Sequence, residues 1–174
     1  MERVVIVDRQ GRRIGTEEKI QAHAAGGTLH LAFCVFVLDA AGRLLLQRRA
    51  DQKYHFPGLW SNSCCGHPRP GEGVVAAAER RLGEEFGFTT ALRPVTAFTY
   101  YAEDAVSGLA EHEYAHVLVG RADGCEPAPA PEEIGDWCWL APPQASADAA
   151  CRPGRYTPWF RRLITEQPVS AWLE

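Results

Sequence analysis

Residues 60–88 bring together three kinds of side chain that can carry out chemistry. A loop with Cys64, Cys65 and His67 leads directly into a segment that ends with Glu84 and Glu85. Thiols and carboxyl groups can transfer protons, imidazoles can bind a metal, and carboxylates can hold a magnesium ion. Few loops with a purely structural role need all three groups, so this segment is the first candidate for an active site.

A second pair of carboxylates lies further along the chain. Glu111 and Glu113 are two residues apart in a stretch expected to be a strand, so both side chains leave the same face of the sheet. Two carboxylates on one face repel each other unless a cation or a raised pKa relieves the repulsion. A solvent-facing strand edge explains the spacing equally well. His112 and His116 lie on the opposite face and are expected to be structural or surface residues.

Three histidines occur in separate segments, at His23, His30 and His67. Each one alone is more often a core or surface residue than a ligand. Together with the two carboxylates of the expected strand, they would form a complete ligand set for a divalent transition metal. Cys65, taken alone, fits a buried inert cysteine as well as a reactive one, and Cys64 is expected to be inert.

The segment that follows the loop is predicted to be a helix. Val75, Ala78, Leu82 and Phe86 recur at steps of three and four residues and form an apolar stripe. Gly87 is expected to end the helix in a left-handed conformation. Two pairs with (i, i+4) spacing are predicted on the wetter face, Arg80–Glu84 and Arg81–Glu85. Spacing alone favours a solvated role for these glutamates.

Apolar and alternating runs predict strands on both sides of this helix. Strands are expected at residues 4–8, 29–38, 44–47, 92–101, 111–120 and 136–140, and a second helix at residues 158–166. Residues 39–42 form a turn between two of the strands, and residues 125–131 are a short extended spacer rather than a domain linker. The pattern indicates a mixed α/β (α+β) fold with one or two helices, in a single compact domain over residues 1–174.

Composition narrows the class of protein. With 174 residues and 46% hydrophobic residues, the chain can bury a sizeable core, and no apolar run is long enough to cross a membrane. The N-terminus has no export-signal pattern, so a cytoplasmic enzyme is expected. A net charge of −4 gives no reason to expect a nucleic-acid partner. The six cysteines form no C-x-x-C pair, which favours reduced thiols.

The helix and the loop before it also match a known motif. Gly66, Glu72, Arg80, Leu82, Glu84, Glu85, Gly87 and Phe88 follow the spacing G-x5-E-x7-R-E-U-x-E-E-x-G-U, in which U is a bulky aliphatic or similar residue. Residues 66–88 thus resemble the Nudix box. Arg81 stands where the box has a glutamate that helps to hold the catalytic magnesium of Nudix hydrolases. A cation at this position argues against ordinary diphosphate hydrolysis.

A wider set of motifs covers essentially the whole chain. They are E-K-I-Q-A-H (18–23), T-L-H-L-A-F (28–33), R-R-A (48–50), P-G-L-W-S-N-S-C-C-G-H-P (57–68), F-T-Y-Y-A (98–102), E-H-E (111–113) and T-P-W (157–159). This set is similar to that of the type 1 isopentenyl-diphosphate isomerases, the non-hydrolytic branch of the Nudix superfamily. The resemblance implies a Nudix fold with mixed β-sheets sandwiched with helices. It also implies interconversion of isopentenyl and dimethylallyl diphosphate through a tertiary carbocation, in isoprenoid biosynthesis.

Carried over by position, the resemblance implies roles for individual residues. One divalent metal (manganese, magnesium or zinc) would be held by His23, His30, His67, Glu111 and Glu113. Cys65 and Glu113 would be the catalytic pair, with Tyr100 beside them; one extra residue before Glu111 leaves Tyr101 as the alternative. Glu85 would hold a magnesium ion that bridges to the substrate diphosphate. Substrate contacts are implied for Lys19, Arg49, Lys53 and Arg81 at the diphosphate and for Trp159 at the carbocation, with Trp60 as the second choice.

Two other functions stay open. A Nudix hydrolase would release phosphate from a nucleoside diphosphate derivative and show no isomerase activity. A catalytically inactive, metal-stabilised binding module would bind its ligand without turnover. For the isomerase, the expected partner is a small isoprenoid diphosphate, with no nucleic acid or membrane, and the chain is expected to be a monomer.

Overall fold

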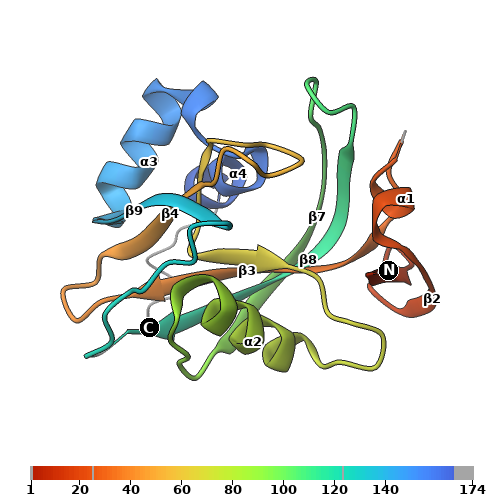
Figure 1. Ribbon diagram of the computed structural model, residues 1–174, viewed down its shortest axis with the longest axis horizontal. Coiled ribbons are helices and arrows are strands. Elements are labelled where there is room, and N and C mark those ends of the chain that lie inside the picture. Colours follow the sequence, from red (N-terminus) through yellow and green to blue (C-terminus); the bar gives the residue numbers. More distant parts are fainter. Residues whose placement is uncertain (1, 25, 123, 167–174) are drawn as a thin grey trace.

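Nine strands form one mixed sheet in the computed structural model, which describes residues 2–24, 26–122 and 124–166 (Figure 1). The strands are β1 (Arg3–Val7), β2 (Arg13–Glu18), β3 (His30–Leu38), β4 (Leu44–Arg49), β5 (Trp60–Ser61), β6 (Cys64–Gly66), β7 (Arg93–Glu103), β8 (Ala110–Arg121) and β9 (Ile134–Leu140). The helices are α1 (Lys19–His23), α2 (Val74–Phe86), α3 (Pro142–Cys151) and α4 (Pro158–Glu166), with a 3₁₀ turn, η1 (Pro153–Arg155).

Strand β3 lies at the centre of the sheet. All nine of its residues are buried, which explains why its sequence is a nearly continuous apolar run rather than an alternating one. It pairs in parallel with β8 and antiparallel with β6. The register places His30 opposite Glu113 and Cys34 opposite Cys65. The central strand therefore brings two distant chemical motifs to one surface.

Helices cover both faces of the sheet (Figure 1). On one face, the apolar stripe of α2 packs against Phe33, Val35 and Val37. On the other face, α3 and α4 pack against the opposite side chains of β3, which include Cys34 and Phe36. This arrangement confirms the predicted mixed fold, in which sheet and helices form a sandwich. In the described part of the chain, no helix is long and apolar enough to cross a membrane.

The predicted strands and the two predicted helices are present, with ends shifted by a few residues at most. Helix α2 ends at Gly87, which has φ of 73° and donates its N–H to the carbonyl of Gly83, so the predicted left-handed stop is confirmed. Both predicted pairs on this helix form. Arg80 lies 3.2 Å from Glu84 and Arg81 lies 2.5 Å from Glu85.

The expected number of helices, one or two, is wrong, because the described residues contain four. Helix α1 has only five residues, too few for a helical period to repeat. Helix α3 buries only Ala145 and Ala149, whose small side chains produce a weak apolar stripe. These two helices therefore leave little trace in the hydrophobic pattern.

Candidate active site

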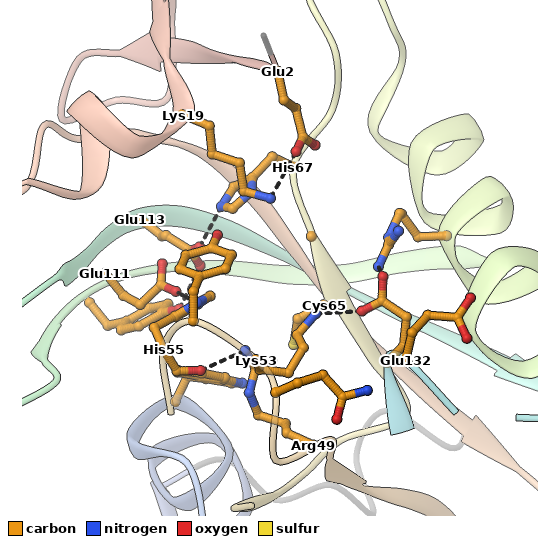
Figure 2. A pocket seen from close by; sticks show the side chains of 17 residues that line it. Glu2, Lys19, Arg49, Lys53, His55, Cys65, His67, Glu111, Glu113 and Glu132 are labelled. Atoms are coloured by element: carbon orange, nitrogen blue, oxygen red, sulfur yellow. Dashed lines mark hydrogen bonds and ion pairs between the residues drawn. The ribbon is translucent and has the colours of Figure 1, made fainter. Parts of the chain in front are cut away.

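A cavity of about 380 Å³ opens on the sheet face that also carries α4 (Figure 2). Most of the predicted site residues line it: Lys19, Arg49, Lys53, Cys65, His67, Arg81, Tyr100, Glu111, Glu113 and Trp159. The other three lie directly behind this lining. His23 and His30 are fully buried beside His67, and Glu85 is buried against Arg81.

Five of these side chains converge on one point. His23, His30, His67, Glu111 and Glu113 each offer a ligand atom, and these atoms all lie within 4.8 Å of one another. They come from α1, β3, the residue after β6, and β8. Glu111 and Glu113 are 3% and 6% exposed, which rules out the solvent-facing strand edge that the sequence left open.

The hydrogen bonds of the histidines fix which ring nitrogens face this point. Nδ1 of His23 donates to the carbonyl of Lys19, and Nδ1 of His30 donates to that of Thr28, both at 2.7 Å. Their Nε2 atoms therefore present lone pairs, and Nε2 of His30 lies only 3.1 Å from Nε2 of His67.

A further pair of atoms at this point lacks hydrogen bonds. Nε2 of His23 and Oε2 of Glu111 are buried and 3.2 Å apart, yet neither makes a hydrogen bond to another described residue. Converging lone pairs and two carboxylates repel one another unless a cation lies between them. The donor set of three imidazoles and two carboxylates therefore fits one divalent metal.

Burial shifts the pKa values of the histidines and glutamates in this cluster. Burial and the neighbouring Glu111 carboxylate raise the pKa of Glu113 well above its ordinary value. Burial, with a smaller contribution from His23, lowers the pKa of His30 to about 4, and burial also holds the pKa of His67 well below its usual range. His30 and His67 are thus held in the neutral form, which is the form that binds metals. The neighbouring Glu111 carboxylate instead raises the pKa of His23 despite its burial.

Tyr100 lies beside Glu113. The register of β7 and β8 pairs these two residues, and the Tyr100 hydroxyl donates to Oε2 of Glu113 at 2.6 Å. His67 contacts the other oxygen, Oε1, at 2.9 Å. Tyr101 lies on the other face of the strand and is 51% exposed. Of the two tyrosines that the sequence offered, Tyr100 is the one next to Glu113.

Cys65 lies across the cavity from the two carboxylates (Figure 2). Because successive residues of a strand point to opposite faces, β6 buries Cys64 under α2 and turns Cys65 toward the cavity. Sγ of Cys65 lies 3.1 Å from Nδ2 of Asn62 and 3.7 Å from Sγ of Cys34. The fully buried Asn62 also donates to the carbonyl of Val35, so its amide is held in place beside the thiol.

Two of the cations at the cavity, Lys53 and Arg81, share a carboxylate. Glu133 contacts both Lys53 and Arg81, and Arg81 also contacts Glu85. Nε2 of Gln47 donates to the second oxygen of Glu85 at 2.8 Å. Two side chains of α2 and two from loops therefore form one charged network beside the cavity: Arg81, Glu85, Lys53 and Glu133.

Lys19 and Arg49 are held separately. Lys19 lies 3.0 Å from Glu2. Arg49 is only 8% exposed, and its guanidinium donates to the backbone carbonyls of His55 and Phe56. The same guanidinium lies 5.8 Å from the ring centre of Trp159, whose Nε1 donates to Ser61. Trp60 is not among the residues that line the cavity.

Among the site residues that the sequence did not mark are Asn62, Glu133 and His55. His55 is buried and contacts Oε1 of Glu111. A single histidine in an aromatic loop has no spacing that marks it as a site residue. Glu133 follows another glutamate in a loop rich in proline, so its sequence context resembles a solvated turn.

Known proteins resemble this chain over nearly its full length. Residues 28–160 match the NUDIX domain family. A protein of Halorhodospira halophila named isopentenyl-diphosphate Delta-isomerase is 72% identical over 172 residues, which cover 99% of this chain and 98% of that protein. A protein of the same name from Burkholderia multivorans is 50% identical over 163 residues, or 94% of this chain and 91% of that protein.

Among solved structures, DR0079 from Deinococcus radiodurans superimposes with a TM-score of 0.76 at 21% identity, covering 95% of this chain and 98% of that one. This likeness supports the fold alone. The extent and identity of the sequence matches carry the assignment, and the chain belongs to the isopentenyl-diphosphate Delta-isomerase family of NUDIX-domain proteins.

Proposed function

We propose that this protein is an enzyme that interconverts isopentenyl diphosphate and dimethylallyl diphosphate in isoprenoid biosynthesis. The names of the relatives that are 72% and 50% identical support this activity. The observation that carries the proposal is the placement of two opposed proton-transfer groups: Cys65 and the Tyr100-bonded Glu113 line one cavity. Cations stand at the same cavity, as an anionic substrate requires.

The reaction moves a double bond by adding a proton to one carbon and removing a proton from another. An alkene is a weak base, so it needs a positioned acid on one side, a base on the other, and protection from water. Glu113, whose Oε2 accepts a hydrogen bond from the Tyr100 hydroxyl, donates a proton to the alkene. Cys65 removes a proton from the opposite side of the resulting carbocation. The two roles exchange in the reverse direction.

The metal site belongs to this proposal. His23, His30, His67, Glu111 and Glu113 would hold one divalent ion, and manganese, magnesium and zinc all suit mixed nitrogen and oxygen ligands. When bound, the ion would supply positive charge that neutralises the two buried carboxylates. The protein itself orients Glu113 through His67 and Tyr100, at opposite oxygens of the carboxylate.

Diphosphate binding is assigned to the cationic side chains of the cavity: Lys19, Arg49, Lys53 and Arg81. Glu85 would hold a magnesium ion that bridges to the diphosphate, since carboxylates and phosphate oxygens are typical magnesium ligands. Trp159 would stabilise the carbocation through its ring face by roughly 0.5–2 kcal/mol. We further infer that the enzyme acts as a monomer in the cytoplasm.

The decisive experiment is incubation of the purified protein with isopentenyl diphosphate, magnesium and manganese. The expected product is allylic and therefore decomposes in acid, whereas the starting material does not. Incubation in D₂O should also introduce deuterium into the product. Release of phosphate from ADP-ribose or a nucleotide, without any acid-labile product, would overturn the proposal in favour of a hydrolase. Binding of the substrate without turnover would favour a binding module instead.

A further inference from the structure

His55 lies at the metal cluster but is not one of its five ligands. It belongs to the loop between β4 and β5 and is 8% exposed. Its Nε2 contacts Oε1 of Glu111, while Oε2 of the same carboxylate faces Nε2 of His23 at 3.2 Å. The two oxygens of Glu111 thus have different partners: Oε2 faces His23 of the cluster and Oε1 faces His55. Figure 2 shows Glu111 and His55 close together.

The protonation of His55 follows from its surroundings. Its Nδ1 is buried and has no hydrogen-bond partner among the described residues. A protonated nitrogen without an acceptor is costly to bury, so the ring proton belongs on Nε2, where the carboxylate accepts it. His55 is therefore a hydrogen-bond donor to Glu111.

The backbone around His55 is held in an unusual conformation. Phe56 has φ of 46° and is the one non-glycine residue with a positive φ in the described part of the chain. Such a conformation is unfavourable and persists only where the surroundings enforce it.

Two groups enforce this conformation. The Arg49 guanidinium donates to the carbonyls of His55 and Phe56 at 3.0 and 3.1 Å, and the Phe56 N–H donates to Asp104 at 3.1 Å. The backbone carbonyls of His55 and Phe56 and the N–H of Phe56 are thus all held by side chains. These contacts fix the backbone conformation from which the His55 side chain points toward Glu111.

We propose that His55 is a positioning residue of the metal centre, which binds one oxygen of Glu111 and leaves only the other oxygen to face the ion. The proposal rests on the metal site described under the proposed function. A buried carboxylate ligand with a free second oxygen can rotate or turn both oxygens to the metal. Hydrogen bonds to ligating carboxylates prevent this, and loss of such a partner typically lowers metal affinity about 10–100-fold.

The test compares Co²⁺ binding by the metal-free full chain in three variants, by competition with a chelator and by visible absorption. His55→Leu removes the donor and should weaken Co²⁺ binding about 10–100-fold. His55→Gln keeps an N–H at a similar distance from the backbone and should retain most of the affinity. His116→Leu, the same change on β8 but away from the cluster, should bind Co²⁺ as the wild type does.

Folding is checked separately by the Tm of each variant in chelator. If His55→Gln retains the Co²⁺ affinity that His55→Leu loses, and its Co²⁺ spectrum is unchanged, His55 acts by positioning Glu111 rather than by a general structural effect. Wild-type affinity in His55→Leu would overturn the positioning role while leaving the metal site intact. A glutamine variant as weak as the leucine variant, with an altered spectrum, would also overturn it and indicate that His55 is itself a ligand. Failure of the wild type to bind Co²⁺ would overturn the metal site and the inference together.

Discussion

At the scale of single residues, proton transfer is assigned to one sulfur and one carboxyl group with different surroundings. Glu113 is buried, carries a raised pKa and bonds to Tyr100 and His67. Cys65 is only half-buried and contacts Asn62. Each group is thus held by a neighbour that restricts its rotation, and pre-positioned acids and bases contribute about 10²–10⁴-fold to a rate.

Cys65→Ala and Glu113→Gln should each lower kcat by at least about 10²–10⁴-fold, because each removes one of the two proton-transfer groups. Steady-state kinetics with isopentenyl diphosphate would measure the loss, and circular dichroism would verify the fold. Cys64→Ala is the matched control: it leaves a small cavity under α2 and lowers stability, but it should keep its turnover. A Cys65→Ala enzyme as active as Cys64→Ala would contradict the assignment.

At the scale of elements, α2 and the loop before it form one braced unit. The Arg80 guanidinium binds both oxygens of Glu72, at 2.8 and 2.9 Å, and Oε2 of Glu72 also accepts the N–H of Arg69. These contacts join the loop after His67 to the second turn of the helix. The brace therefore links the loop that follows His67 to the helix that carries Arg81 and Glu85.

Glu72→Gln should destabilise the protein by about 1 kcal/mol at pH 7, with a smaller effect in acid. Hydrogen bonds from Arg80 lower the pKa of Glu72 from its ordinary 4.5 to about 2. A depressed folded-state pKa means that the contribution is complete above about pH 4.5 and disappears as the pH falls toward 2.

Urea unfolding of wild type and Glu72→Gln at several pH values between 7 and 3 would test this effect. The difference in free energy of unfolding should shrink as the pH falls below 4.5. Glu166→Gln, in an exposed (i, i+4) pair of α4, is the control and should change little. If the difference in free energy of unfolding between wild type and Glu72→Gln stays constant with pH, the Glu72–Arg80 contact is not stabilised by charge.

At the scale of the whole molecule, the metal cluster joins parts of the chain that are far apart in sequence. α1, β3, residue 67 and β8 each contribute side chains that could hold a metal ion at one point. An unfolded chain cannot hold these groups together, so an ion that binds the cluster favours the folded state. Binding of an ion by this cluster is therefore expected to raise the stability of the whole fold.

A divalent ion should raise the Tm. An ion at about 100 times its Kd stabilises a protein by about 2.7 kcal/mol, which for this chain length corresponds to a rise of roughly 5–11 °C in Tm. Calorimetry with Mn²⁺ or Zn²⁺ against the same protein in EDTA would measure the shift. Glu111→Gln removes one charged ligand with little change of volume, so its Tm should depend less on the ion. Equal Tm values for the wild type with ion and with chelator would argue against the site.

Patterns of residues close together in the sequence were sufficient to predict much of the secondary structure. The apolar period of α2, its glycine stop and the run of β3 depend on residues close in sequence, so they could be predicted. The short α1 and the alanine-rich α3 could not, because their burial comes from partners elsewhere in the chain. The family motifs likewise identified most residues that line the cavity, since those residues lie in recognisable segments.

The sequence by itself determined the family, the secondary structure around the site and the types of group available for chemistry. Only the tertiary structure decided which groups meet: it brings Tyr100 rather than the alternative Tyr101 beside Glu113, and it places His55 against Glu111. The physical reason is that strand pairing and loop closure set these contacts. Side chains alternate between the two faces of a strand, so the sequence predicts which residues share a face. Which of these faces lines the cavity depends on the register between distant strands, which the tertiary structure sets.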